Sequence, residues 1–527
     1  MIKFIHYIKK PMIPKIKTFA NVGLQGHEIV VEVDEAKSLP TIDIIGLPDA
    51  AIRESKERIR ATFRNVGIQL PRRKFIVNLS PSDIKKIGTS FDLPMALGIL
   101  LLIVEGKFHH AEQLEQFLFF GELGLDGEIK RVNGLLPSVI SAMKQGYKHF
   151  FVPAENVYEL EYVPDIFIYP LSTFRQVVQY FLHNEELPVI SEAKQIEQLY
   201  DRDRSYDLDF QFIKGQILAK RALAIAAAGG HNVVMIGAPG SGKTMLSKAL
   251  QSILPPLEFE EVLEVSQIYS VVGKLDKDMP LVTHRPFRQI HHTASKISIT
   301  GGGSNLTPGE VSLAHKGILF FDELTEFPRE VLEVLRQPLE DRSVVISRVA
   351  GTIEYPANFM FVAAMNPCKC GYHKDPEKPC ICNLHDIKKY QSKISGPLLD
   401  RVDMILEIPR EHIDKILDTI QSDSSATIRA KVLHAWKAQQ TRFAGTGIFS
   451  NAQMGSRHID EYIHLDEQVK QFLIAAAQKL TLSPRVVHRT IKLARTIADM
   501  ESSEQISVNH LAEAMQYRSK TMFVEAD

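Results

Sequence analysis

Residues 237–244 read GAPGSGKT, which fits the phosphate-binding pattern G-x-x-x-x-G-K-[ST]. Residues 232–236 (NVVMI) before it have the composition of a buried strand, and residues 245–252 continue as a helix. The glycines let backbone N–H groups turn toward phosphates, and the helix N-terminus adds a partial positive charge. We expect Lys243 to reach the β- and γ-phosphates of a nucleotide and Thr244 to hold Mg²⁺. The expected contact residues are Gly237, Gly240, Ser241, Gly242, Lys243 and Thr244.

A second motif follows the apolar run at residues 317–321 (GILFF), which ends in Asp322 and Glu323. A buried parallel strand is typically this apolar, and its carboxyl end faces the ligand. We expect Asp322 to complete the Mg²⁺ shell and Glu323 to orient and deprotonate the attacking water. A plain strand followed by solvated acids is the alternative, and the glycine loop upstream disfavours it.

Two further segments carry weaker signals. Residues 359–365 (FMFVAAM) look like a third strand and end in Asn366, whose polar tip could position the water or sense the γ-phosphate. Taken alone, an Asn here is usually a turn residue. Residues 395–403 read SGPLLDRVD, and Arg401 is a candidate arginine finger for a neighbouring subunit's nucleotide. A salt-bridged surface arginine is the alternative.

Length and composition bound the class of protein. The 527 residues suggest about three domains at roughly 150 residues each. A hydrophobic share of 45% and a charged share of 24% exclude a disordered, collagenous or membrane-embedded chain. The near balance of 62 Lys+Arg against 63 Asp+Glu excludes a globally basic nucleic-acid binder but allows a local basic stripe. No targeting pattern is recognisable, so we expect a cytoplasmic protein that does not enter a membrane.

The pattern of apolar residues changes along the chain. The first block mixes strands (residues 29–33 and 75–79) with helices (residues 49–65 and 91–104). A polar stretch without apolar period follows, then alternating strands and helices, then a nearly all-helical region. The predicted division is an N-terminal domain (1–184), a linker (185–206), an α/β core (207–422) and a C-terminal helical lid (423–527).

Taken in order, these motifs resemble the AAA+ ATPases and, more narrowly, the magnesium-chelatase-like YifB/ComM family. The resemblance extends to residues 213–232 before the glycine loop and to residues 285–324, which begin RPFRQIHHTASK and end GILFFDEL. It implies a multidomain α/β fold with a P-loop core (a parallel sheet with flanking helices) that hydrolyses ATP with Mg²⁺.

The same resemblance implies roles for individual residues. Gly215 and Gln216 would lie near the adenine, and Asn366 would be the sensor-1 residue. Arg401 would be the arginine finger, and Arg485 would be the sensor-2 arginine that reaches the γ-phosphate from the lid. The family implies a homo-oligomeric ring, expected to be a hexamer, in which two subunits share each active site.

Residues 42–67 and 77–100 are similar to the family's N-terminal α+β domain, which has the fold of the Lon protease C-terminal domain. That likeness raises a Ser–Lys protease as an alternative activity. Ser90 falls near the nucleophile position, but residues 132–139 (VNGLLPSV), which should supply the lysine, contain none. We therefore expect a non-proteolytic domain in which Ser90 is an ordinary loop or cap residue.

All four cysteines lie in residues 368–382, CKCGYHKDPEKPCIC, at Cys368, Cys370, Cys380 and Cys382. Two thiolate pairs suit a tetrahedral Zn²⁺ site, although the spacing is C-x-C rather than C-x2-C. His373 is a possible substitute ligand, and four reduced thiols on an ordered loop are the alternative. Four sulfur ligands would leave no open coordination position, so a structural zinc is expected.

The family resemblance implies that the motor acts on DNA, through branch migration during recombination or DNA uptake. Candidate DNA contacts are Lys274, Arg285 and Arg288, in a stretch with interleaved His284, His291 and His292, and Arg342 and Arg348 in a hairpin predicted over residues 342–355. Scattered surface cations are one alternative. Another is a motor that remodels a protein complex, as magnesium-chelatase motor subunits do.

Overall fold

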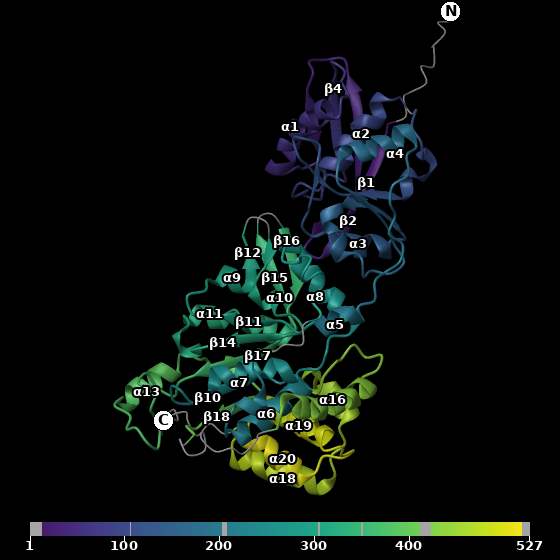
Figure 1. Ribbon diagram of the computed structural model, residues 1–527. Helices are drawn as coiled ribbons and strands as arrows, with labels where there is room; N and C mark the ends of the chain where they lie inside the picture. Colours follow the sequence, from purple (N-terminus) through teal and green to yellow (C-terminus); the bar gives the residue numbers. More distant parts are fainter. Residues whose placement is uncertain are drawn as a thin grey trace, which may run out of the picture. The chain divides into compact units, whose positions relative to one another are not determined.

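The computed structural model describes residues 13–105, 107–202, 208–303, 306–348, 351–411 and 423–518. The chain divides into two compact units (Figure 1). The first comprises Met1–Asp201 and Val262–Val282, and the second comprises Arg202–Glu261 and Thr283–Asp527. Helix α8 (Phe259–Val271) therefore begins in the second unit and ends in the first.

The first unit is built on a seven-stranded mixed sheet in the order β3-β4-β2-β1-β5-β8-β9. Its strands are β1 (Lys15–Val22), β2 (Gln25–Ala36), β3 (Ile42–Ile45), β4 (Lys74–Ser80), β5 (Phe117–Phe119), β8 (His149–Pro153) and β9 (Phe167–Leu171), beside a short hairpin of β6 (Glu122–Leu123) and β7 (Ile129–Lys130). Strand β2 pairs antiparallel with β1 and β4, whereas β5, β8 and β9 run parallel. The strands predicted at residues 29–33 and 75–79 lie within β2 and β4.

Helices cover this sheet. They are α1 (Ala50–Asn65), α2 (Asp92–Ile103), α3 (Leu135–Lys144), α4 (Phe174–His183) and the separate short α5 (Glu197–Arg202). Helix α2 is apolar on all sides and almost wholly buried, as its sequence predicts. Its first residue, Asp92, is buried, and Nε of the half-buried Arg58 lies 2.6 Å from a carboxylate oxygen. That ion pair compensates a charge that would otherwise be costly in the core.

The second unit contains a five-stranded parallel sheet in the order β11-β14-β17-β10-β18. The strands are β10 (Val233–Ile236), β11 (Phe287–Ile290), β14 (Ile318–Phe321), β17 (Met360–Met365) and β18 (Met404–Glu407). The three central strands are buried along their whole length, because helices shield both faces of such a sheet. Since all five run the same way, their carboxyl ends share one edge and their amino ends the other.

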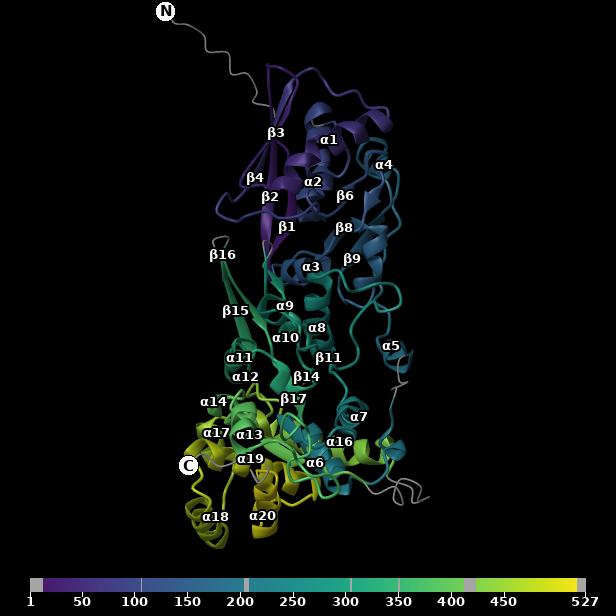
Figure 2. The ribbon, with the colours of Figure 1, turned by 90° about the vertical axis from the view of Figure 1, so that its left-hand side faces the viewer.

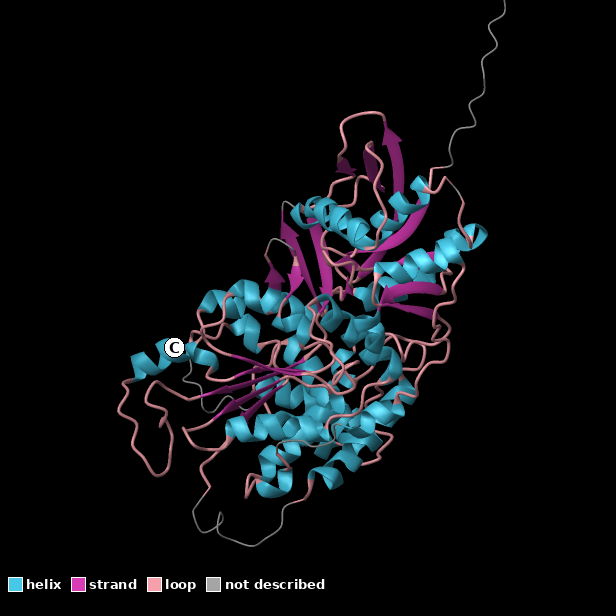
Figure 3. Cartoon of the chain, turned by 45° about the horizontal axis from the view of Figure 1, so that its top comes forward, coloured by secondary structure: helices cyan, strands magenta, loops and turns pink. Residues whose placement is uncertain are grey.

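Helices surround the sheet and continue into the C-terminal region (Figure 3). Around the sheet lie α6 (Ile217–Gly229), α7 (Lys243–Ala249), α9 (Lys296–Thr300), α10 (Glu310–Leu313), α11 (Arg329–Glu333), α12 (Arg336–Asp341), α13 (Leu384–Gln391) and α14 (Gly396–Leu399). The C-terminal helices are α16 (Ser425–Arg442), α17 (Ser456–Tyr462), α18 (Glu467–Lys479), α19 (Pro484–Met500) and α20 (Val508–Gln516). One continuous hydrophobic core joins sheet, α6, α16 and α19. No helix in the described ranges is long and apolar enough to cross a membrane.

The predicted hairpin is present as β15 (Ser343–Arg348) and β16 (Gly351–Pro356), and it extends away from the five-stranded sheet (Figure 2). Val344 and Ile346 are buried, whereas Arg348 at the far end is exposed. A smaller hairpin pairs β12 (Gly301–Gly302) with β13 (Thr307–Pro308). The fold class expected from the sequence, a multidomain α/β protein with a parallel-sheet core and a helical C-terminal region, is confirmed.

Candidate functional site

The glycine loop joins the carboxyl end of β10 to helix α7. Gly240 and Gly242 adopt φ values of +79° and +91°, which side chains disfavour, and the space above both is open. Gly237 is required for a close approach of two backbone segments, because a Cβ there would lie 2.3 Å from the carbonyl oxygen of Ile408. The loop is thus an open turn at a helix N-terminus, which is the geometry that a phosphate chain needs.

Lys243 is folded back into this loop. Its Nζ donates to the carbonyl oxygens of Gly237 (2.7 Å) and Ala238 (2.9 Å) and to Oδ1 of Asn366 (3.4 Å). The side chain is only 9% exposed. Burial lowers the pKa of Lys243 to about 8, against the opposing charges of Asp322 and Glu323. The ammonium therefore sits between the glycine loop and the end of β17.

Two oxygen ligands meet beside Lys243. Oγ1 of Thr244, in the first turn of α7, donates to Oδ2 of Asp322 at 3.0 Å. Asp322 follows β14 directly. Magnesium prefers such hydroxyl and carboxylate oxygens, completed by water and substrate phosphates. The donor set therefore fits Mg²⁺, with Thr244 and Asp322 as the side chains that would hold it.

Glu323 is the more exposed of the two acids. Its backbone is left-handed (φ 52°), and 58% of its side chain is exposed. Nδ1 of His292 lies 4.0 Å from its carboxylate. In the sequence, His292 stands out only as part of a basic stretch. Ile290 of β11 pairs with Phe321 of β14, so His292 and Glu323, each two residues further along the chain, follow neighbouring strands at the same level. The register of these two strands would have indicated that His292 and Glu323 are neighbours.

Gly215 and Gln216 lie against the glycine loop from the N-terminal side of α6. Nε2 of Gln216 donates to the carbonyl oxygens of Pro409 (2.7 Å) and Ser241 (3.4 Å). Gly215 has no room for a side chain, since a Cβ would fall 2.3 Å from the Glu411 carboxyl carbon. Gln216 therefore contacts the glycine loop at Ser241.

The four cysteines converge. Every pair among Cys368, Cys370, Cys380 and Cys382 lies within 4.8 Å, sulfur to sulfur. The measured Sγ–Sγ separations include 3.3, 3.6 and 3.5 Å. Four sulfurs at such distances fit the corners of a tetrahedron around Zn²⁺, with Zn–S bonds of about 2.3 Å. His373 is not a member of this cluster among the described residues.

The cysteine loop rests on the glycine loop. A Cβ added to Gly371 would lie 2.5 Å from Cδ of Pro239. Arg410 connects the same two segments, because its Nη2 donates to the Pro239 carbonyl (3.3 Å) and its guanidinium lies 3.8 Å from Asp375. The conformation of the cysteine loop therefore constrains the glycine loop at Pro239.

Arg401 and Arg485 lie together at the opposite edge of the sheet. Both bind the carboxylate of Glu340 in α12, Arg485 through Nη2 at 2.7 Å and Arg401 through Nη2. They line a cavity with Asn232 and Phe359, which precede β10 and β17. Within one chain, the structure therefore does not bring Arg485 to the γ-phosphate side of Lys243. It holds both arginines at the amino-terminal edge instead.

The proposed DNA contacts separate into distinct environments. Arg285 is half-buried and donates to the carbonyls of Pro255 (2.7 Å) and Lys316 (2.7 Å) and to Glu261 (3.2 Å). Arg288 makes a two-pronged ion pair with Glu310, at 2.6 and 2.8 Å. Arg342 lines the cavity at the amino-terminal edge. Arg348 in the second unit and Lys274 in the first are exposed. Only these last two keep the accessibility that a DNA contact needs.

Ser90 has no lysine partner among the described residues. The nearby Lys86 is buried, its pKa is lowered by burial, and its ammonium donates to the carbonyl of Pro81. The Ser90 carbonyl accepts from Gly121. Nothing in this loop activates the hydroxyl as a nucleophile.

Comparison with known proteins identifies the family. Three family models match: magnesium chelatase subunit ChlI (residues 209–416), subunit ChlI of Mg-chelatase (31–156) and the ChlI C-terminal model (422–518). The competence protein ComM of Haemophilus influenzae is 37% identical over 96% of this chain and 97% of its own. The protein YifB of Salmonella typhimurium is 36% identical over 96% of both chains. The magnesium-chelatase 67 kDa subunit of Heliobacterium mobile is 25% identical over 30% of this chain and 28% of its own. The chain belongs to the YifB/ComM family of magnesium-chelatase-like AAA+ ATPases.

Proposed function

We propose that this protein is a ring-forming ATPase that converts ATP hydrolysis into movement of DNA. One observation carries the proposal: Lys243, Thr244 and Asp322 meet at one edge of the sheet, while Arg401 and Arg485 gather at the opposite edge. Neither edge holds the complete set of residues. A head-to-tail ring, expected to be a hexamer, would bring the two edges of neighbouring subunits together around each nucleotide.

The residues of the carboxyl edge have separate tasks. The open glycine loop receives the phosphates, and Lys243 exchanges its loop carbonyls for β- and γ-phosphate oxygens. Thr244 and Asp322 would hold Mg²⁺, which would neutralise phosphate charge. Glu323 accepts a proton from the attacking water, and Asn366 orients that water or senses the γ-phosphate. Gly215 and Gln216 border the adenine.

The residues of the amino edge act on the neighbouring subunit. Arg401 would place its guanidinium against the γ-phosphate as charge develops in the transition state, and Arg485 would contact the same group. In this arrangement Glu340 holds both arginines until a phosphate replaces it. The zinc ion would be structural, bracing the loop beneath Pro239.

DNA is the proposed substrate because of exposed cations and the similarity to a competence protein. Arg348 lies at the far end of a hairpin that leaves the core, where a cation can follow phosphates without reading bases. Lys274 is a second exposed candidate. Remodelling of a protein complex is the other candidate, favoured by the match to a magnesium-chelatase subunit and by the net charge of −1.

The ATPase rate, with and without single-stranded and branched DNA over a salt series, separates these functions. A DNA-driven motor gives stimulation that falls steeply as salt rises, because cations on the protein displace counterions from the phosphates. Absence of DNA binding at about 50 mM salt would contradict the DNA role. Hydrolysis without DNA stimulation would then favour protein remodelling.

A further inference from the structure

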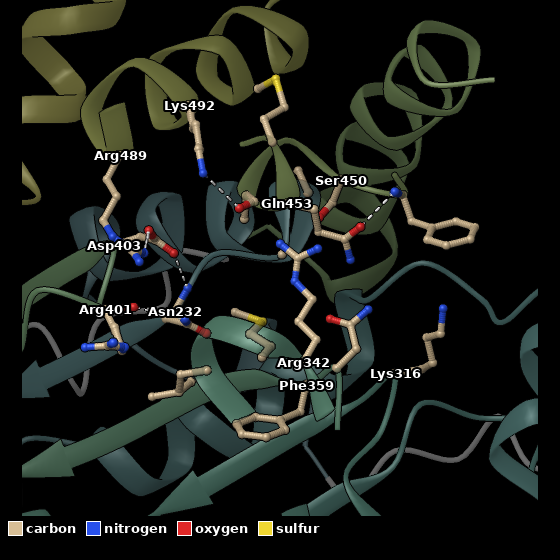
Figure 4. A pocket seen from close by; sticks show the side chains of 18 of the residues that line it. Asn232, Lys316, Arg342, Phe359, Arg401, Asp403, Ser450, Gln453, Arg489 and Lys492 are labelled. Atoms are coloured by element: carbon tan, nitrogen blue, oxygen red, sulfur yellow. Dashed lines mark hydrogen bonds and ion pairs between the residues drawn. The ribbon is translucent and has the colours of Figure 1, made fainter. Parts of the chain in front are cut away.

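The second unit has a partly open cavity of about 470 Å³ at the amino-terminal edge of its sheet, below the C-terminal helices (Figure 4). Its walls come from the starts of β10, β14 and β17, from α12, and from α16, α17 and α19. This volume is within the range of small-molecule binding sites. The cavity is separated from Lys243 by the length of the parallel sheet.

The charges lining the cavity do not balance. Among the described residues, seven arginine or lysine side chains face three carboxylates. Glu261 is taken by Arg285 and Lys316, at 3.2 and 3.4 Å. Glu340 is taken by Arg401 and Arg485. Two cations, Arg342 and Lys492, are left without a carboxylate of their own.

Asp403, the third acid, already has several close partners. It pairs with Arg489, accepts the backbone N–H of Asn232 at 2.9 Å, and lies 3.7 Å from His231. Burial alone would raise the pKa of Asp403, but Arg489 and His231 keep it well below its usual range. It is therefore a fixed negative charge whose close ion pair is with Arg489.

Arg342 and Lys492 are the uncompensated cations. The guanidinium of Arg342 points from the sheet side toward Gln453, and its side chain makes no hydrogen bond or ion pair within the described structure (Figure 4). Lys492 donates only to the carbonyl of Ala452, at 3.3 Å. Burial lowers the pKa of both, that of Lys492 to about 8. The charge of Asp403 favours both cations, but its close ion pair is with Arg489, so an added anion would stabilise Arg342 and Lys492 further.

We propose that this cavity binds a small phosphorylated molecule, whose phosphate lies between Arg342 and Lys492. The phosphate supplies two negative charges and several acceptor oxygens, and the cavity supplies cations and amide donors in excess. Gln453 contributes such a donor, since its Oε1 is taken by the Phe449 N–H while its Nε2 faces no partner in the described structure. Phe359 and Trp436 line the same cavity and offer aromatic faces to the rest of the ligand.

The cavity shares Arg401 and Arg485 with the proposed hydrolytic interface, but the proposed phosphate ligands are different residues. They are Arg342 and Lys492, whereas Arg401 and Arg485 are paired with Glu340. The ligand would bridge the start of β15 and helix α19, which belong to the core and to the C-terminal region. Occupancy would therefore stabilise the contact between these two parts of the second unit.

Full-length protein carrying Lys243→Ala tests the proposal, because the glycine loop then contributes little to phosphate binding. Inorganic pyrophosphate is titrated calorimetrically at constant ionic strength, in this background and with Arg342→Met, Lys492→Met or Lys431→Met added. Lys431 is the matched control, since it is an exposed cation of α16 paired only with Asp423 at 3.4 Å. We expect saturable binding that weakens about tenfold or more in the two cavity variants and is unchanged in the control.

The thermal unfolding midpoint gives a second readout, in which Lys492→Met should stabilise the free protein although it weakens pyrophosphate binding. Without pyrophosphate, Lys492→Met should unfold at a higher temperature than its parent, because it removes an uncompensated cation, and pyrophosphate should no longer raise that midpoint. Non-saturable binding, or equal weakening in Lys431→Met, would overturn the proposal. So would displacement of pyrophosphate by duplex DNA, which would make the cavity a nucleic-acid contact. Wild-type ATPase activity is measured in parallel, so failure here is distinguishable from failure of the proposed motor function.

Discussion

The two edges of the five-stranded sheet differ in the balance between cationic and acidic side chains. At the carboxyl edge, Lys243 is balanced by loop carbonyls and by Asp322 and Glu323. At the amino edge, cations outnumber acids, and one carboxylate, Glu340, holds two arginines. A balanced edge can bind a substrate with its own Mg²⁺, whereas a cationic edge needs anions from outside the chain. The contrast is what the proposed sharing of each hydrolytic site between two subunits would require.

The largest effect is expected from Lys243→Ala at the carboxyl edge. Removing the ammonium takes away the hydrogen bonds to the β- and γ-phosphates, so we expect nucleotide affinity to fall by about 100-fold. Binding of a fluorescent ATP analogue measures the loss. Lys248→Ala, an exposed lysine of the same helix, is the control and should bind normally. Equal affinities in both variants would remove Lys243 from the site.

Arg401→Ala probes the opposite edge. The variant should fold and bind ATP normally, but its turnover should fall about 1,000-fold, within the range measured for arginine fingers. Steady-state phosphate release gives the rate, and Arg329→Ala is the matched control. Normal hydrolysis by Arg401→Ala would contradict the division of labour between the edges.

Glu323→Gln separates binding from chemistry at the carboxyl edge. Loss of the carboxylate removes the proton acceptor, so we expect unchanged ATP affinity and a turnover that falls by about 100-fold. Single-turnover hydrolysis measures the chemical step directly. Glu326→Gln, an exposed acid one helical turn away, should retain activity. A similar defect in both variants would point to a general charge effect.

Zinc removal should affect only the carboxyl edge. Metal analysis of protein purified without chelator should find about one zinc per chain, and stripping it should weaken ATP binding, because the cysteine loop supports Pro239. His373→Ala should keep its zinc, since His373 lies outside the cluster. Protein without zinc would refute the metal site.

The smallest effect is expected at the hairpin. Arg348→Ala should weaken DNA binding equally for all sequences and reduce the salt slope by about one. Fluorescence anisotropy over a salt series measures both, with Lys296→Ala as a control for an exposed cation elsewhere. An unchanged slope would place the DNA contact on other residues.

The sequence predicted what local patterns determine. Glycines at 240 and 242 imply positive φ angles, and apolar runs imply the buried strands β10, β14 and β17, since a parallel sheet is covered on both faces. Carboxyl ends of parallel strands meet at one edge, so the contact between Thr244 and Asp322 was also predictable. The domain boundaries and residue roles remain predictions.

Other contacts between residues far apart in the chain could not be predicted from the sequence. Glu340 meets Arg401 and Arg485 across 61 and 145 residues of chain, and no local pattern indicates that contact. Arg285 looks like a surface cation in sequence, but in the structure it is half-buried and donates to two backbone carbonyls. The departure of residues 262–282 into the first unit likewise depends on tertiary contacts. The cavity around Arg342 follows from the same kind of packing.

Mixing two inactive variants tests the shared-site account most directly. Lys243→Ala subunits keep Arg401, and Arg401→Ala subunits keep Lys243, so mixed rings would contain interfaces with both. We predict that the mixture hydrolyses ATP well above the sum of the separate proteins, with a maximum near equal amounts. A mixture that stays as inactive as its components, although size analysis shows mixed assemblies, would contradict the account.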